Sequence, residues 1–233
     1  MSKPKPLKSF KVMTFDVVGT LIDFEKGMLD YLRKSGAAPS SVGDQAILDV
    51  YRNARGAKQT ELYPDDLKRC YGDLVRHAGL KDGATFARGF RDSAEFWPAF
   101  PDSVEALKRL SARYRLVAMT NAQRWALDHF ARTLGNPFWD TISVDEALTE
   151  KPDPVYFGFV RGRISRSGFV QSEILHVAQS QYHDIGVAKQ LGYTTCWIER
   201  RKGLSAGGTI KAAAQTVPDY HFATLAELAD RAT

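Results

Sequence analysis

The 233-residue chain has few cysteines and no long apolar run. Cys70 and Cys196 lie far apart and form no Cys-x-x-Cys pair, which excludes a disulfide-stapled scaffold and favours the reducing cytoplasm. No stretch approaches the roughly 18 consecutive apolar residues of a membrane span. The basic start, MSKPKPLKSF, leads into no apolar stretch with a cleavage site, so we expect no secretory signal. The sequence therefore predicts a cytoplasmic protein without a membrane partner.

A strong excess of one charge is also missing, because the chain has 32 Lys and Arg residues and 27 Asp and Glu residues, which give a net charge of only +5. The basic residues are spread along the chain, and no block of five or six of them occurs, which argues against a nucleic-acid partner. A mildly basic surface keeps a protein soluble and also suits a small anionic substrate. The chain is long enough to bury a core without a metal or disulfide.

Strand and helix patterns alternate through most of the chain. Residues 11–18, KVMTFDVV, show the nearly continuous apolar pattern of a strand covered on both faces. Alternation of strands with helices predicts βαβ units, and hence an α/β fold with a doubly wound, Rossmann-like parallel sheet. The Gly- and Ala-rich segment 202–219 is expected to be a loop. Further strands are expected within residues 115–121, 140–148, 173–180 and 193–200, and helices within 103–114, 124–135, 154–165, 184–192 and 224–232.

Residues 27–98 differ from the rest because their apolar residues recur only at the three- and four-residue spacing of helices. This pattern predicts a helical cap domain inserted into a core domain made of residues 1–26 and 99–233. The sequence PAFPD at 98–102 ends the last cap helix and returns the chain to the core.

Chemically active side chains follow several of the predicted strands. They are Asp16 with Thr20, Thr120 with Asn121, Lys151, and Asp184. The carboxyl ends of parallel strands share one edge of a sheet, where ligands bind, so we expect these side chains to converge. A carboxylate can act as a nucleophile, and hydroxyl, amide and ammonium groups can hold it and an anionic substrate.

These residues lie in four ordered motifs: FDVVGTLID, MTN, LTEKPDP, and LHVAQSQYHDIGVAKQLGYTTCWIER. Together with the inserted helical segment, the motifs resemble those of the haloacid dehalogenase (HAD) superfamily, and within it the type II (S)-2-haloacid dehalogenases. The resemblance covers roughly residues 10–200 and places Asp16 at the nucleophile position. It implies a HAD core with a helical cap. Related dehalogenases are often dimers, so the resemblance also allows a homodimer.

Two departures from the superfamily's phosphatases favour carbon–halogen cleavage. Phosphatases carry a second Asp two residues after the nucleophile, where this chain has Val18, which cannot transfer a proton to a leaving oxygen. Magnesium-using members have a further acid shortly before the position of Asp184, where this chain has Gln179, Ser180 and Gln181. We therefore expect no metal and no other cofactor.

The resemblance implies that Asp16 displaces halide from a small anionic 2-haloacid and forms an ester, which water hydrolyses to a 2-hydroxy acid. Lys151 would keep Asp16 ionised, and Asp184 would hold Lys151 or position the water. The resemblance implies hydrogen bonds from Thr20, Thr120, Asn121 and Ser180 to the nucleophile, the substrate carboxylate or the oxyanion. A cap arginine would bind the halide, with Arg52 as the closest match and Arg55 as the alternative.

Structural explanations for the same residues remain open. Asp16, Asn121 and Asp184 could cap helices, and Lys151 and Arg52 could be solvated surface charges. His183 beside Asp184 is interpreted as a partly exposed histidine without a catalytic task. Two other functions also remain: a phosphatase of the same fold acting on small phosphate esters, and a non-catalytic binding protein with a HAD fold.

Overall fold

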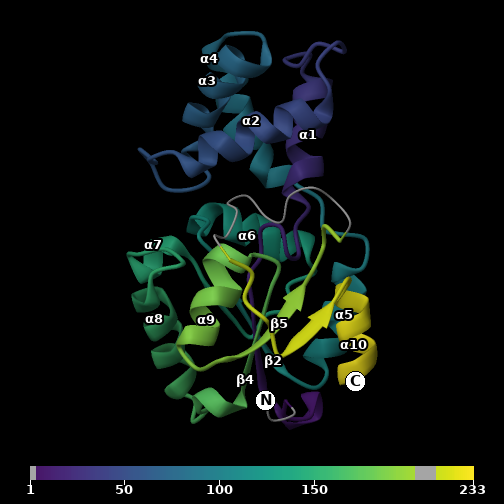
Figure 1. The fold of residues 1–233 in the computed structure, drawn as a ribbon, viewed down its shortest axis with the longest axis vertical. Coiled ribbons are helices and arrows are strands. Elements are labelled where there is room, and N and C mark those ends of the chain that lie inside the picture. The colour runs from purple at the N-terminus through teal and green to yellow at the C-terminus, as the bar shows by residue number, and fades with distance from the viewer. Residues whose placement is uncertain (1–3, 203–213) are drawn as a thin grey trace. The chain divides into compact units, whose positions relative to one another are not determined.

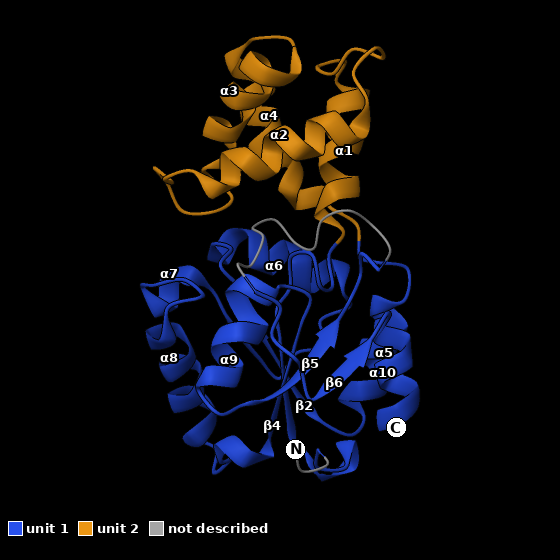
Figure 2. Cartoon of the chain, viewed as in Figure 1, with its two compact units in different colours: residues 1–22, 99–233 blue, residues 23–98 orange. Residues whose placement is uncertain are grey.

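The computed structural model describes residues 4–202 and 214–233. The chain divides into two compact units, residues 1–22 with 99–233 and residues 23–98 (Figure 2). The first segment of the core unit ends at residue 22, whereas the sequence pattern predicts that it ends at residue 26. The difference arises because the Asp23 carboxylate accepts a hydrogen bond from Lys26 N–H (3.1 Å) and so starts α1 (Phe24–Lys34) earlier than the apolar pattern indicates.

A six-stranded sheet forms the centre of the first unit, and all neighbouring strands run parallel. The chain builds outwards from β1 through β2 to β3, and then returns to place β4 on the other side of β1. This reversal confirms the predicted doubly wound α/β fold, in which ligands bind beyond the carboxyl ends of the strands at the point of reversal. The strands, in spatial order, are β3 (Asp140–Ile142), β2 (Arg115–Met119), β1 (Val12–Phe15), β4 (Ile174–Ala178), β5 (Thr194–Ile198) and β6 (Tyr220–Phe222).

Helices cover both faces of this sheet (Figure 1). On one face lie α8 (Pro154–Ser165) and α9 (Gly186–Gln190), and on the other α5 (Ser103–Ser111) and α10 (Leu225–Ala232). The chain also forms α6 (Arg124–Thr133) and the short α7 (Val144–Ala147). Buried Val12, Val117 and Ile174 from three adjacent strands pack with Phe157 and Ile164 of α8. Burial of each such side chain contributes roughly 1.5–3 kcal/mol, which fixes the sheet that carries the site.

The second unit is helical, as the sequence predicts. It contains α1, α2 (Asp44–Gly56), α3 (Leu67–Ala78), α4 (Ala84–Asp92) and a 3-10 turn (Ser93–Phe96). Trp97 is buried in this unit, and a Cβ atom at Gly27 would lie 2.2 Å from its indole ring. Glycine at position 27 therefore allows α1 to approach Trp97 closely.

Two elements differ from the sequence analysis. The strand expected over residues 11–18 ends at Phe15, and the short edge strand β6 is missed because its three residues show no buried pattern. Residues 203–213 of the expected loop 202–219 lie outside the described residues, and residues 214–219 contain no helix or strand. Within the described segments, every helix is too short or too polar to cross a membrane.

Candidate active site

The residues predicted to converge follow the carboxyl ends of the sheet's strands, where the strand order reverses. Asp16 directly follows β1, and Thr120 directly follows β2. Asp184 lies after β4 in a π-helical turn, Gln181–Ile185, and Lys151 lies in the loop before α8. Separate loops thus carry the groups, and the parallel sheet brings them together.

Lys151 bridges the two carboxylates. Its ammonium donates to Asp16 Oδ1 (2.8 Å), to Asp184 Oδ1 (2.6 Å) and to the carbonyl oxygen of Met119 (3.1 Å). These three bonds use all of its donors. The side chains of Lys151 and Asp184 are 1% exposed, and that of Asp16 is 10% exposed. With all three groups charged, the cluster carries one net negative charge.

Burial and ion pairing oppose each other in this cluster. Burial, together with repulsion from Asp184, raises the pKa of Asp16, although Lys151 and Thr20 lower it. Burial would also raise the pKa of Asp184, but Lys151 and His176 outweigh it and lower that pKa to about 2. Burial would lower the pKa of Lys151, yet the two carboxylates raise it above its ordinary value. Lys151 and Asp184 are therefore firmly charged, whereas Asp16 is the less stabilised anion of the two carboxylates.

Thr20 fixes the second oxygen of Asp16. Its hydroxyl donates to Asp16 Oδ2 (2.6 Å) and accepts from the N–H of Gln179 (2.9 Å). The turn that brings Thr20 back to Asp16 includes Gly19, whose φ of 87° lies in the left-handed region. Because each Asp16 oxygen has a donor, the carboxylate is oriented before any substrate binds.

Asn121 and Thr120 shape the loops around Lys151. The Asn121 side chain donates to the Lys151 carbonyl (2.7 Å) and accepts from the Lys151 N–H (2.8 Å). The Thr120 hydroxyl accepts from the N–H of Ala122 (3.2 Å), and the Thr120 carbonyl accepts from the Tyr156 hydroxyl (2.8 Å). The prediction that Asn121 binds the nucleophile or substrate stays a prediction, and these bonds tie its amide to the Lys151 backbone.

Ser180 organises the turn that carries Asp184. Its hydroxyl accepts from the N–H of His183 (2.9 Å) and lies 3.2 Å from His183 Nδ1. Gln181 Oε1 accepts from the N–H of Thr216 (3.0 Å). These bonds order the segment between β4 and α9. Val18 forms an isolated bridge with Ile22 and adds no ionisable group.

Arg52 and Arg55, the two candidate halide ligands, both lie on α2 of the second unit. The Arg52 guanidinium donates to Glu25 Oε1 (2.8 Å) and to Asp49 Oδ1 (2.8 Å). Its side chain is 10% exposed, so it is not the solvated surface charge of the structural interpretation.

Arg55 belongs to a buried network within the same unit. It donates to Asp66 Oδ2 (3.0 Å), lies over the Tyr63 ring at 4.6 Å, and is 7% exposed. Asp66 also accepts two bonds from Arg69 (2.8 and 2.7 Å). This network links α2 to the start of α3 within the second unit.

His176 and Thr14 are site residues that the sequence analysis misses. The Thr14 hydroxyl lies 2.9 Å from His176 Nδ1, and His176 Nε2 lies 3.3 Å from Asp184 Oδ1. Both side chains are buried beneath the Lys151 cluster. The only sequence signal is a polar residue inside the apolar strand ILHVA, and the pattern gives no indication of its partner.

Magnesium takes a near-octahedral shell of oxygen ligands, usually one or two carboxylates together with waters. Over residues 4–202 and 214–233, no three His, Cys, Asp or Glu side chains group closely enough to hold a metal. Lys151 already provides the positive charge between Asp16 and Asp184. Lys151 is therefore the counter-charge for both carboxylates.

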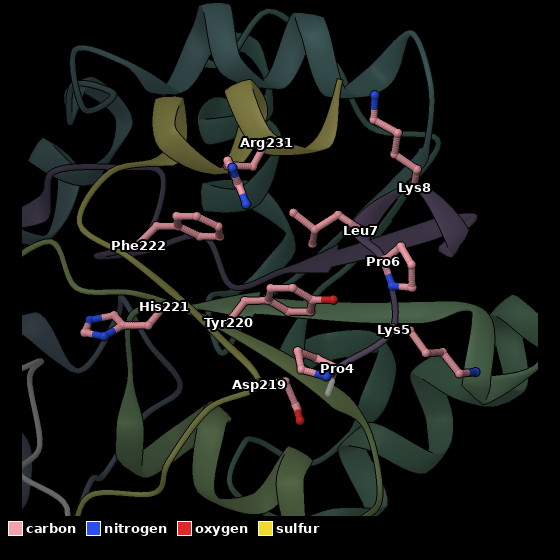
Figure 3. A pocket seen from close by; sticks show the side chains of 10 residues that line it. All are labelled: Pro4, Lys5, Pro6, Leu7, Lys8, Asp219, Tyr220, His221, Phe222 and Arg231. Carbon is pink, nitrogen blue, oxygen red and sulfur yellow. The ribbon is translucent and has the colours of Figure 1, made fainter. Parts of the chain in front are cut away.

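A pocket of about 550 Å³ lies away from this cluster, beside β6 and the segment that precedes β1 (Figure 3). Its lining includes Leu7, Lys8, Tyr220 and Phe222, and none of the cluster residues. We therefore assign it no part in the chemistry of Asp16.

Known proteins with similar sequences or folds include several dehalogenases. Among curated proteins, an (S)-2-haloacid dehalogenase from Pseudomonas putida is 24% identical over 208 residues, which are 84% of this chain and 88% of the relative. The L-2-haloacid dehalogenase of Xanthobacter autotrophicus has a TM-score of 0.72 at 21% identity, covering 95% of this chain and 97% of that one. The same enzyme solved with chloropropionic acid covalently bound gives a TM-score of 0.67 at 20% identity, with coverage of 95% and 97%.

A magnesium-bound structure shares the fold as well. YfnB from Bacillus subtilis, described as a HAD-hydrolase, has a TM-score of 0.75 at 21% identity, covering 96% of this chain and 98% of that one. Structural likeness at such identities shows the fold alone. The family model described as haloacid dehalogenase-like hydrolase matches residues 10–192, which include Asp16, Lys151 and Asp184. The chain therefore belongs to the haloacid dehalogenase-like hydrolases.

Proposed function

We propose that the protein hydrolyses small 2-haloacids to 2-hydroxy acids through a covalent ester on Asp16. The observation that carries this proposal is an oriented, buried Asp16 held by Lys151, with Val18 where a phosphatase needs an acid. A halide leaves as a stable anion, whereas an alkoxide needs a proton near neutral pH. The dehalogenase relatives, one with chloropropionic acid covalently bound, support the same chemistry.

In the first step, one Asp16 oxygen forms a bond to the α-carbon of the substrate, and the carbon–halogen bond breaks. Both electrons of that bond leave with the halide. Lys151 and Thr20 hold the carboxylate in place, so little orientational freedom is lost on reaching the transition state.

An anionic substrate needs positive charge and hydrogen-bond donors that the core cluster does not supply, because the cluster itself is net negative. The Thr120 hydroxyl accepts from Ala122 N–H, which leaves its proton for the substrate carboxylate. Arg52 is our candidate for binding the halide, because it is the closest match to the cap arginine that the resemblance implies. The alternative, Arg55, is held by Asp66 and the Tyr63 ring.

In the second step, water attacks the carbonyl carbon of the Asp16 ester. Asp184 is ionised, and its Oδ2 has no hydrogen-bond partner among the described residues, so we propose this oxygen as the acceptor of the water proton. Lys151 lies against the Asp16 oxygen and stabilises the negative charge that develops there. The bond between the carbonyl carbon and the ester oxygen then breaks, and the proton passes to that oxygen, so the product leaves as a 2-hydroxy acid. The second water proton is released to solvent, which restores Asp16 as a carboxylate.

Halide release over a small panel tests the proposed function. The panel contains fluoroacetate, chloroacetate and both enantiomers of 2-chloropropionate, each with EDTA or with added magnesium. We expect halide from at least one compound at the same rate in both conditions. Magnesium-dependent turnover of small phosphate esters without halide release would instead establish the phosphatase, and no turnover of either class would favour a binding protein.

The two cap arginines give a paired prediction. Arg52→Ala is expected to lower kcat/KM for the best haloacid by about a hundredfold, because an anion loses a charge-assisted ligand. Arg55→Ala is expected to lower the free energy of unfolding by about 2 kcal/mol, because Asp66 is 0% exposed and loses one of its charged partners. Steady-state kinetics and urea denaturation of both variants measure this. A larger kinetic loss in a stable Arg55→Ala protein would move the halide site to Arg55.

A further inference from the structure

A row of polar residues crosses the sheet directly beneath the Lys151 cluster. Thr14 of β1, His176 of β4 and Thr195 of β5 are register partners in neighbouring parallel strands, so their side chains emerge on the same face. All three are buried. His176 connects this row to the site, because Nε2 lies 3.3 Å from Asp184 Oδ1 and Nδ1 lies 2.9 Å from the Thr14 hydroxyl.

We propose that His176 is a positioning residue that holds Asp184 in the orientation needed for hydrolysis of the Asp16 ester. This inference rests on the proposed function and extends it to a residue of the strand interior. His176 lies beneath Asp184 and acts on the reacting water through that carboxylate.

The two oxygens of Asp184 have different surroundings. Oδ1 accepts from both Lys151 Nζ (2.6 Å) and His176 Nε2 (3.3 Å), whereas Oδ2 has no partner in the described part of the chain. Two donors on Oδ1 oppose rotation of the carboxylate, and this keeps Oδ2 facing away from both donors, as the proposed proton acceptor. Without His176, only Lys151 would oppose that rotation.

The imidazole is itself held in place. Because Asp184 is an acceptor, Nε2 carries a proton, and Nδ1 bonds to the Thr14 hydroxyl. The Phe157 ring packs edge-on against the imidazole with centroids 5.5 Å apart. The ring therefore has one orientation, fixed by two hydrogen bonds and one aromatic contact.

The two chemical steps should respond differently to loss of His176. Lys151 keeps its bonds to Asp16 and Met119 in such a variant, so the nucleophile stays in place for ester formation. Hydrolysis depends on Asp184 and loses the hydrogen bond that orients it. The expected result is an enzyme that forms the ester at a nearly normal rate and hydrolyses it slowly.

Single-turnover kinetics with intact-protein mass spectrometry tests this. In His176→Leu, which is similar in size, we expect hydrolysis of the ester to slow by about ten- to a hundredfold, the scale of one hydrogen bond to a charged group. The rate of halide release in the first turnover should change less than about threefold, and the ester mass should accumulate. His176→Gln, which retains a side-chain N–H donor, should restore most of the hydrolysis rate.

Thr195→Val is the matched control, because Thr195 lies in the same buried row and bonds to Asp219. Thr195→Val should change neither step. If His176→Leu does not fold, Thr14→Val tests the same role, because it removes the hydroxyl bonded to His176 Nδ1, and it should also accumulate the ester. Equal slowing of both steps, or no accumulation of ester in both His176→Leu and Thr14→Val, would overturn the role of His176. Absence of halide release from the wild-type protein would instead overturn the proposed function, and this inference with it.

Discussion

Replacing Asp16 with asparagine is expected to abolish halide release, with kcat lowered by about 10⁵-fold or more. The amide cannot act as the displacing carboxylate, and losses of this size follow removal of an enzyme's nucleophile. Initial rates of halide release at high enzyme concentration measure the residual activity. Residual activity within about a hundredfold of the wild type would show that Asp16 is not the nucleophile.

The same substitution is expected to leave the protein at least as stable at pH 7. Because burial raises the pKa of Asp16, ionised Asp16 contributes less to folding as the pH rises through its folded-state pKa. Asparagine removes that unfavourable ionisation, while Lys151 keeps its bond to Asp184. Urea denaturation should therefore show no loss in the free energy of unfolding, which separates a lost nucleophile from a damaged fold. Asp16→Glu keeps the charge but moves it by one methylene, and we expect it to lose at least about a hundredfold in kcat.

Lys151→Met is expected to lower kcat by about 10³-fold and the free energy of unfolding at pH 7 by about 3–5 kcal/mol. Removing the ammonium leaves two buried carboxylates without their common partner. Asp16 then ionises less readily, so the residual activity should rise with pH. Urea denaturation and halide release over a pH series measure both effects.

The contribution of Asp184 to the pH dependence of stability should change sign in this variant. In the wild-type protein the pKa of Asp184 is about 2, below its ordinary 3.8, so Asp184 contributes stability above pH 3.8 that is lost as the pH falls towards 2. Without Lys151, burial raises the pKa of the paired carboxylates above their ordinary value, so stability is present at low pH and lost as the pH rises.

Lys189→Met is a suitable control for Lys151→Met. Lys189 pairs with Asp219 at 2.5 Å, but its side chain is 37% exposed, and such surface pairs contribute less than about 1 kcal/mol. It should change neither the activity nor the sign of the pH dependence. Equal losses of stability in the two variants would contradict the central position of Lys151.

The convergence of Asp16, Lys151 and Asp184 could be predicted from the sequence because it follows from one topological rule. Each lies after a strand or in a loop at the same end of a parallel sheet, and the strands are long and apolar enough to recognise. A search for apolar strands misses β6, because Tyr220 and Phe222 are only partly buried and His221 is exposed.

Specific hydrogen-bond partners could not be predicted in this way. His176 reads as one polar residue within ILHVA, and its role depends on β4 lying beside β1, which the local sequence does not encode. Asn121 is found at the predicted place, yet its partner is a backbone 30 residues further on. The start of α1 depends on the Asp23 cap, which the spacing of apolar residues does not reveal.

The origin of the product's new oxygen tests the central claim most directly. A single turnover with excess enzyme in oxygen-18 water separates attack by Asp16 from direct attack by water. In the proposed route, the hydroxyl oxygen of the first product molecule comes from Asp16 and carries no label, while the peptide that contains Asp16 gains one oxygen-18. A labelled product and an unlabelled Asp16 peptide after that first turnover would contradict the covalent route.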